Sequence, residues 1–279
     1  MEREVLKNVM ISHCRKLSRS ISEREIKTIL PLSEEEIGQL KKGSGNAEIE
    51  YLFADSSTAL GVNYFSLYKE CHEECKVEYE WDKDSPLLVG GKSNLDIWLK
   101  EGNIIKFYES KFLEPYYMSN SSFTDSYYNP DNYKVNKELA KKLIKKIRCC
   151  DNFKYYNVSQ LIRHVLAIYN HIYHNPKEYE GIDEVVLISI CWEMPDSFIK
   201  SMENVTKRSI SYLNKRIEAL LKERIKAEAY INQLINLLQP ELEKKLDIKL
   251  SFKTDSYNNA ISALRESEYL DSFKEQYFL

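Results

Sequence analysis

Asp96, Glu109 and Lys111 are the residues of this chain whose types and spacing could do chemistry. Two carboxylates placed opposite each other on a sheet repel by up to roughly 1 kcal/mol, unless a positive group lies between them. Mg²⁺, or Mn²⁺ as a substitute, binds carboxylate oxygens and keeps several waters, and a neighbouring ammonium could orient or help deprotonate one of these waters. Such a set indicates phosphodiester cleavage. A solvated sheet face with the same three residues is the alternative that this pattern leaves open.

A predicted β-hairpin brings these residues together. Residues 95–100 and 104–112 alternate in polarity and are rich in β-branched and aromatic side chains, and Gly102-Asn103 between them is a two-residue turn signal. If this turn sets the register, residues whose numbers sum to 205 lie opposite each other. We therefore expect Asp96 to face Glu109 with Cβ atoms about 5 Å apart. Lys111, two residues further on, shares that face.

The hairpin belongs to a longer resemblance. The strings SSTALGVNYFSLY at 56–68, SNLDIWL at 93–99 and ESKFLEPY at 109–116 occur in this order. Together they resemble the PD-(D/E)xK nuclease superfamily, and within it an uncharacterised bacterial family of restriction-endonuclease-like proteins. The resemblance covers roughly residues 46–195. Leu95 stands where the superfamily's name-giving Pro would be, a position that the superfamily often varies.

The resemblance implies a role for each residue of the motif. Asp96 and Glu109 would hold Mg²⁺, the backbone carbonyl of Ser110 would complete the coordination, and Lys111 would align the attacking water. In the superfamily the first core helix often supplies a further acidic ligand, for which Glu48 and Glu50 are the candidates. A glutamate at a helix start more often only favours the helix dipole, so this alternative stays open.

Two further groups of candidates lie outside the hairpin. The alternating stretch at 76–81 predicts a strand whose acidic face could neighbour Asp96, which makes Glu80 a possible extra ligand, although a solvated strand face is the commoner explanation. Residues 158–173 have helical periodicity and carry Gln160, Arg163 and His164 on one polar stripe. Superfamily members place a Gln on this helix, so Gln160 could position the water or a phosphate. Hydrogen bonding to neighbouring elements is the alternative for Gln160 and the favoured one for His164.

The order of elements supports an α/β fold. The pattern predicts a helix at 47–70, the strand and hairpin, a helix at 158–173 and a buried strand at 184–192. This is the αβββαβ order of a restriction-endonuclease-like core with a mixed sheet flanked by helices. We expect three parts: an N-terminal helical lead at 1–45, the core at 46–195, and a C-terminal helical extension at 196–279 packed on the core. Within the lead, two or three short helices are expected, including one around 26–30.

The C-terminal part is expected to be mostly helical. Apolar residues follow a helical period from residue 205 to residue 238, and Pro240 should end this helix. The helix would brace the core or form a homodimer interface. Residues 247–253 could add an edge strand, and residues 258–278 could form a closing helix. A Tyr-rich stretch at 116–133 could stack on unpaired bases or, as the preferred alternative, attach a long loop to the body.

Composition limits the partners. The 279 residues carry a net charge of −3 with a pI of about 6.1, so a DNA surface has to be local rather than global. The best candidate for phosphate contacts is the basic side of a helix at 137–148, with Arg163 nearby, although such a run of charges is usually only a solvated helix face. No apolar window long enough for a membrane span and no signal-like start occurs, so we expect a cytoplasmic protein without a membrane partner. The lysines of this basic side are Lys141, Lys142, Lys145 and Lys146.

These patterns, together with what the resemblance implies, predict a metal-dependent deoxyribonuclease. The chain contains no Walker-type loop, no Gly-rich dinucleotide fingerprint and no Gly-x-Ser-x-Gly elbow, which argues against ATP-driven and acyl-transfer chemistry. The competing class is a protein that kept the fold without catalysis and binds DNA or another protein.

Overall fold

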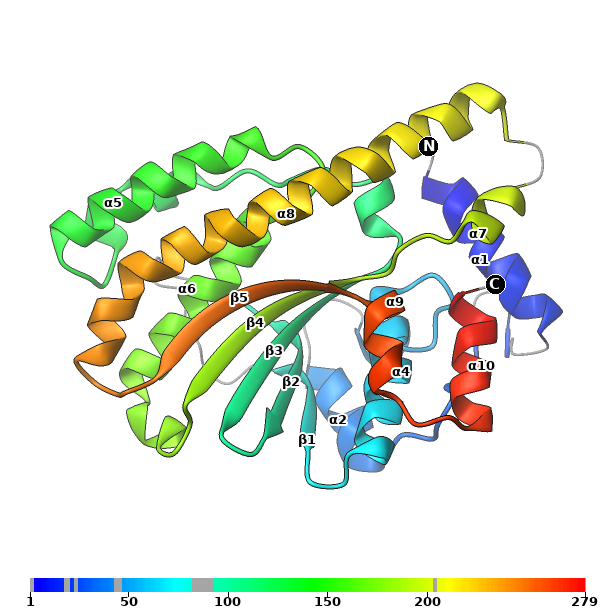
Figure 1. The fold of residues 1–279 in the computed structure, drawn as a ribbon, viewed down its shortest axis with the longest axis horizontal. Helices are drawn as coiled ribbons and strands as arrows, with labels where there is room; N and C mark the ends of the chain where they lie inside the picture. Colours follow the sequence, from blue (N-terminus) through cyan, green and yellow to red (C-terminus); the bar gives the residue numbers. More distant parts are fainter. Residues whose placement is uncertain are drawn as a thin grey trace.

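The computed structural model describes residues 3–17, 21–22, 25–42, 47–81, 93–202 and 205–278. Its centre is a five-stranded sheet whose strands lie side by side in the order of the sequence (Figure 1). The first three strands are antiparallel, and the fourth and fifth run parallel to the third. The fold class is therefore α/β with a mixed, open sheet, as expected. The strands are β1 (Lys76–Trp81), β2 (Leu95–Glu101), β3 (Ile104–Lys111), β4 (Glu184–Cys191) and β5 (Lys249–Ser256).

Helices cover both faces of this sheet. On one face α4 (Ser57–Cys71) packs on the three antiparallel strands, and α10 (Glu268–Tyr277) packs on α4. On the other face α6 (Val158–His174) lies beside α8 (Lys207–Glu243), which also contacts β5 and α5 (Lys137–Arg148) (Figure 1). The other helices are α1 (Arg3–Lys16), α2 (Glu34–Lys42), α3 (Ala47–Glu50), α7 (Asp196–Lys200) and α9 (Tyr257–Ala260).

The predicted hairpin register is confirmed. Glu101 pairs with Ile104, and the pairing continues to Ile97 opposite Tyr108. Gly102 has a φ of 55°, a left-handed conformation that glycine adopts without steric cost. The observed limits of the hairpin strands, β1, β4, α5 and α6 differ from the predicted ones by at most one residue.

Two predictions for the N-terminal third are wrong. The expected helix at 47–70 is divided into α3 and α4, because Ser56 caps a new helix by accepting a hydrogen bond from the Thr58 N–H. The expected helix around 26–30 does not form. The N–H of Ile26 bonds to the carbonyl of Leu52, and that of Ile29 bonds to the Asn63 side chain. Long-range partners thus replace the local bonds that a helix would have made.

The C-terminal part differs from its prediction in two details. Pro240 does not end the long helix, which continues to Glu243. The Gln239 side chain fastens this last turn by donating to the Ile248 carbonyl and accepting from the Leu250 N–H on the adjoining β5 segment. The expected closing helix at 258–278 is interrupted: α9 and a 3₁₀ turn precede α10, which starts at a separate cap, Ser267.

The expected edge strand is confirmed as β5, which pairs with β4 over its whole length. The Tyr-rich stretch serves to attach a loop, since Tyr116, Phe123, Tyr127 and Tyr133 are buried. In the described residues, no helix combines the length and apolar character that crossing a membrane requires. The expected limits of the three parts of the chain stay predictions.

Candidate active site

Asp96 lies where the two hairpin strands separate. The last paired residues are Ile97 and Tyr108, and beyond them the Asp96 Oδ2 accepts a hydrogen bond of 2.7 Å from the N–H of Ser110. This side-chain bond replaces the next rung of the ladder and holds the carboxylate against β3. The N–H and C=O of one strand residue point to the same side, so the Ser110 carbonyl also faces β2.

The strand alternation of β3 sends neighbouring residues to opposite faces. The Ser110 side chain points to α4, where its hydroxyl donates to the Ser57 carbonyl at 3.0 Å and lies 2.8 Å from the Tyr257 hydroxyl. A Cβ at Gly61 would lie 3.4 Å from this hydroxyl and 3.2 Å from Ile97, so glycine permits the close approach of α4. Glu109 and Lys111 therefore both point toward α6.

Glu109 is the centre of the site, and its side chain is 2% exposed. Its Oε1 accepts hydrogen bonds from Lys111 Nζ at 2.5 Å and from Gln160 Nε2 at 2.7 Å. Its Oε2 lies 2.8 Å from His164 Nε2. Burial would raise the pKa of Glu109, but Lys111 and His164 outweigh it and lower the pKa to about 2. Burial lowers the pKa of Lys111, but Glu109 and Asp96 raise it above its ordinary value, so the ammonium keeps its proton at neutral pH.

His164 contacts Glu109 directly, although the sequence did not indicate this contact. Its side chain is 3% exposed, with Nδ1 2.6 Å from the Ser93 hydroxyl and Nε2 beside Glu109. The sequence groups His164 with Gln160 on one polar stripe and favours hydrogen bonding to neighbouring elements for His164, and its contacts with Ser93 and Glu109 agree with that expectation. The contact with Ser93 spans 71 positions, so no local pattern could reveal it.

Glu80 also belongs to this cluster of carboxylates. Burial and then the charges of Glu109 and Glu50 raise its pKa to about 7. Burial, Glu109 and Glu80 likewise raise the pKa of Asp96 well above its usual range. Glu80 has a φ of 51°, which is uncommon for a residue other than glycine, and it is buried between two apolar neighbours. The expectation that it could neighbour Asp96 is consistent with this coupling; the Glu48 side chain lies outside the described residues.

The carboxylates are compatible with one Mg²⁺ ion. Within the described residues, no group of three or more Asp, Glu, His or Cys side chains is arranged around one metal position. Mg²⁺, however, is usually held by one or two carboxylates and keeps several waters. The buried Oε2 of Glu109 makes no hydrogen bond of good geometry, even to His164 Nε2, and Asp96 repels Glu109 electrostatically. A cation bound by Asp96 and Glu109 would give Glu109 Oε2 a partner and would reduce the repulsion between the two carboxylates.

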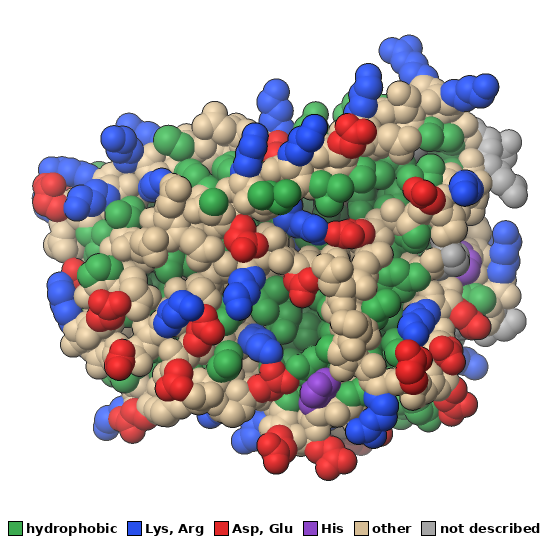
Figure 2. Space-filling model, viewed as in Figure 1, with side chains coloured by type: hydrophobic (Ala, Val, Ile, Leu, Met, Phe, Trp, Pro, Cys, Tyr) green, Lys and Arg blue, Asp and Glu red, His purple; other side chains and the backbone are tan. Residues whose placement is uncertain are grey.

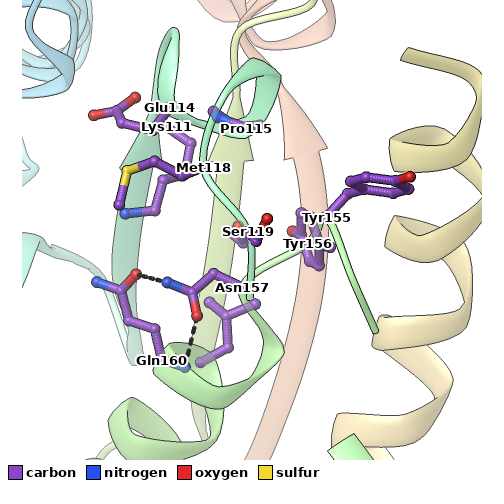
Figure 3. Close-up of a pocket in the computed structure, with 11 residues that line it drawn as sticks. Lys111, Glu114, Pro115, Met118, Ser119, Tyr155, Tyr156, Asn157 and Gln160 are labelled. Atoms are coloured by element: carbon purple, nitrogen blue, oxygen red, sulfur yellow. Dashed lines mark hydrogen bonds between the residues drawn. The ribbon is translucent and has the colours of Figure 1, made fainter. Parts of the chain in front are cut away.

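A pocket opens beside Lys111 and Gln160 (Figure 3). Its walls are the loop after β3, with Glu114, Pro115 and Met118, and the segment that leads into α6. Its floor includes Ser189 of β4, which pairs with Glu109 in the sheet. From the α6 face this pocket therefore reaches Lys111 and Gln160, whereas Asp96 and Glu109 are not among the residues that line it.

The candidate phosphate-binding residues do not form one group with these side chains. Lys141, Lys142 and Lys145 are exposed on α5, where Lys141 pairs with Glu138 at 2.9 Å. Lys146 instead donates to Gln233 of α8 at 2.6 Å. Arg163 donates to the Ser121 hydroxyl and the Ser122 carbonyl. Lys and Arg side chains project along the upper margin of the face in Figure 2, over α8 and α5.

Comparisons with protein-family models, with curated proteins and with solved structures give no match for this chain.

Proposed function

We propose that this chain is a metal-dependent deoxyribonuclease with a restriction-endonuclease-like core, which hydrolyses phosphodiester bonds of DNA. The observation that carries the proposal is the meeting of Asp96, Glu109 and Lys111 at the open end of the hairpin, with Gln160 of α6 on the same carboxylate. A buried carboxylate at Glu109, a half-buried one at Asp96 and a paired ammonium next to a pocket form an arrangement suited to a phosphodiesterase.

Each residue has a separate role in this proposal. Asp96 and Glu109 would hold Mg²⁺, with the Ser110 carbonyl directed to the same side of β3 as Asp96. Lys111 keeps its proton, so it would stabilise negative charge on the phosphate and orient a water rather than act as a base. Gln160 and His164 fix the orientation of Glu109. When bound, the metal would supply Lewis-acid polarisation of the phosphate and a more acidic water.

A second candidate is supported by one observation. Glu109 already has protein groups against both carboxylate oxygens, namely Lys111, Gln160 and His164. A carboxylate neutralised in this way needs no cation. A catalytically silent member of the fold that binds DNA or a protein would have the same network.

Metal binding and cleavage distinguish the two candidates. We expect calorimetry to show Mn²⁺ binding in the wild type and its loss in Asp96→Asn. We expect DNA cleavage with Mg²⁺ to fall on the order of 10²-fold or more in Lys111→Ala, the typical effect of removing one preorganised electrostatic group. Lys106→Ala is the matched control, since Lys106 pairs with Glu101 at the other end of the hairpin. Equal Mn²⁺ affinity in wild type and Asp96→Asn, or a wild type that cleaves no DNA, would favour the silent candidate. Equal cleavage by the two lysine variants would contradict the proposed role of Lys111.

We also propose that the chain acts in the cytoplasm, which rests on the sequence alone. We further propose that it forms a homodimer through α8, where Tyr212, Leu221 and Ile225 are exposed apolar side chains. A molar mass from light scattering that stays at one chain at every concentration would exclude the dimer.

A further inference from the structure

One carboxylate of α8 holds the segment that leads into α6. The Glu223 carboxylate accepts hydrogen bonds from three consecutive main-chain N–H groups, those of Lys154 at 3.0 Å, Tyr155 at 2.8 Å and Tyr156 at 2.9 Å. Hydrogen bonds to an ionised acceptor are stronger than neutral ones. Because residues 153–157 form no helix or strand, this one side chain replaces the partners that regular structure would supply.

A continuous series of hydrogen bonds runs from this segment to Glu109. Asn157 caps α6, and its Nδ2 donates to the Gln160 side chain at 3.0 Å while its Oδ1 accepts from the Gln160 N–H (Figure 3). Gln160 in turn donates to Glu109 at 2.7 Å. Glu223 therefore fixes the start of α6, which carries Gln160 and, one turn further along, His164.

The opposite wall of the pocket is held from the same side of α8. Arg216 precedes Glu223 by seven residues, two helical turns, and is 6% exposed. Its Nε donates to the Pro115 carbonyl at 2.9 Å and its Nη2 donates to the Met118 carbonyl. The guanidinium also lies over the Tyr155 ring, 4.8 Å from the centroid. Arg216 thus joins the loop after β3 to the segment that Glu223 holds.

We propose that Glu223 and Arg216 are positioning residues of the candidate active site, acting from α8 through the two loops that form the pocket walls. This inference rests on the proposed nuclease function. Neither residue has to touch the substrate, because small displacements of catalytic groups caused at a distance can lower a rate by up to about 10²-fold. The helix predicted only to brace the core or to form a dimer would thereby set the geometry of Gln160 and the pocket.

The test compares Glu223→Ala with Glu228→Ala. Glu228 lies on the same helix and accepts two hydrogen bonds from Thr254 of β5, so its removal weakens α8 packing away from the pocket. We expect hydrogen-exchange protection over residues 153–161 to fall at least tenfold in Glu223→Ala and to stay unchanged in Glu228→Ala. We expect kcat for DNA cleavage to fall on the order of tenfold or more, with KM within about twofold. Mn²⁺ affinity should not change.

Glu223→Gln keeps one acceptor oxygen at nearly the same size, so it should lie between wild type and Glu223→Ala in both measurements. Unchanged protection over 153–161 in Glu223→Ala would overturn the inference, and so would reduced protection with an unchanged kcat. A wild type that cleaves no DNA contradicts the proposed function instead. Hydrogen exchange alone then decides whether Glu223 holds the start of α6.

Discussion

At the scale of single residues, the hydrogen-bond donors around the buried Glu109 carboxylate stabilise the folded state. Lys111 has a side chain only 20% exposed, and it gives Glu109 its shortest hydrogen bond. Removing one partner of a buried pair leaves a charge without compensation, which typically costs 3–5 kcal/mol. Gln160 and His164 remain in place and reduce this cost.

We therefore expect Lys111→Ala to lower the free energy of unfolding by about 3 kcal/mol at pH 7. Lys106→Ala should lower it by less than about 1 kcal/mol, because Lys106 and Glu101 are each about one quarter exposed and form a more solvated pair. Urea denaturation of both variants without metal measures the difference. Equal losses of unfolding free energy in the two variants would show that Glu109 does not need the ammonium. Cleavage rates of the two variants must be compared below the lower of their melting temperatures.

Glu80 should make stability depend on pH. In the folded chain its pKa is raised to about 7, by burial and then by Glu109 and Glu50, from an ordinary value of 4.5. Between these two values the folded chain binds more protons than the unfolded chain, so the free energy of unfolding falls as pH rises. The full fall attributable to Glu80 is at most about 3 kcal/mol.

Glu80→Gln removes this titration. In metal-free buffer we expect the variant to gain stability over the wild type at pH 8 and to gain none at pH 4. Asp96, whose pKa is raised in the same direction, keeps a residual dependence in both proteins. Parallel stability curves of the two proteins between pH 4 and pH 8 would contradict the raised pKa of Glu80.

The sequence could predict the hairpin register, and with it that Asp96 and Glu109 lie at the same end of the hairpin, because only local geometry was needed. A Gly-Asn turn and a period of two determine which residues of a hairpin face each other. The contact of His164 with Ser93 joins residues 71 positions apart in the chain, and the positive φ of Glu80 is one that its residue type does not indicate. No periodicity encodes such contacts, so the sequence favoured hydrogen bonding of His164 to neighbouring elements but could not name Ser93 or Glu109 as its partners.

At the scale of elements, regular periodicity predicted α5, α6 and all five strands, whereas breaks between elements were predicted poorly. The division between α3 and α4 is an example. Asp55 lies in this break and forms a buried ion pair of 2.5 Å with Lys7 of α1. The helical pattern of 47–70 continues across the break, and the local sign of an interruption is Ser56, a residue type that favours helix starts and here caps α4.

α5 presents three of the four predicted phosphate-binding lysines to solvent. Lys146 differs, because it is bonded to Gln233 and lies over the Tyr230 ring. We expect charge reversal of Lys141, Lys142 and Lys145 to reduce the slope of log affinity against log salt for duplex DNA, by about 0.9 for each phosphate that these lysines neutralise in the wild type. Fluorescence anisotropy across a salt series, with Asp96→Asn as the background, gives the slope.

Lys215, Lys222 and Lys226 of α8 provide the control for total charge, because reversing these three exposed lysines changes the net charge by the same amount on another helix. A slope that changes equally in both sets of variants would assign the effect to net charge. An unchanged slope in the α5 variants would return these lysines to the solvated-face explanation.

At the scale of the whole molecule, the C-terminal part completes the sheet that carries the site. β5 pairs with all of β4, and the Tyr257 hydroxyl lies 2.8 Å from the Ser110 hydroxyl next to the candidate catalytic residues. The Tyr277 hydroxyl accepts a hydrogen bond from the Asn63 side chain at 2.9 Å, and the main-chain carbonyl of Tyr277 accepts one from the Trp192 ring at 2.8 Å. The resemblance covered only residues 46–195, so it could not indicate how strongly the remaining chain supports this core.

We therefore expect a chain ending at residue 195 to lose cooperative folding. Every residue of β4 except Glu184 is buried, and without β5 its outer edge would lose its hydrogen-bond partners and expose apolar side chains. Near-ultraviolet circular dichroism and a thermal melt of residues 1–195 test this, with the full chain as the reference. A second chain that ends at residue 266 keeps β5 and α8 but lacks α10, so it should retain a cooperative melt at a lower temperature. If residues 1–195 melt cooperatively with native-like aromatic signals, the C-terminal part is an addition to a self-sufficient core, as the sequence suggested.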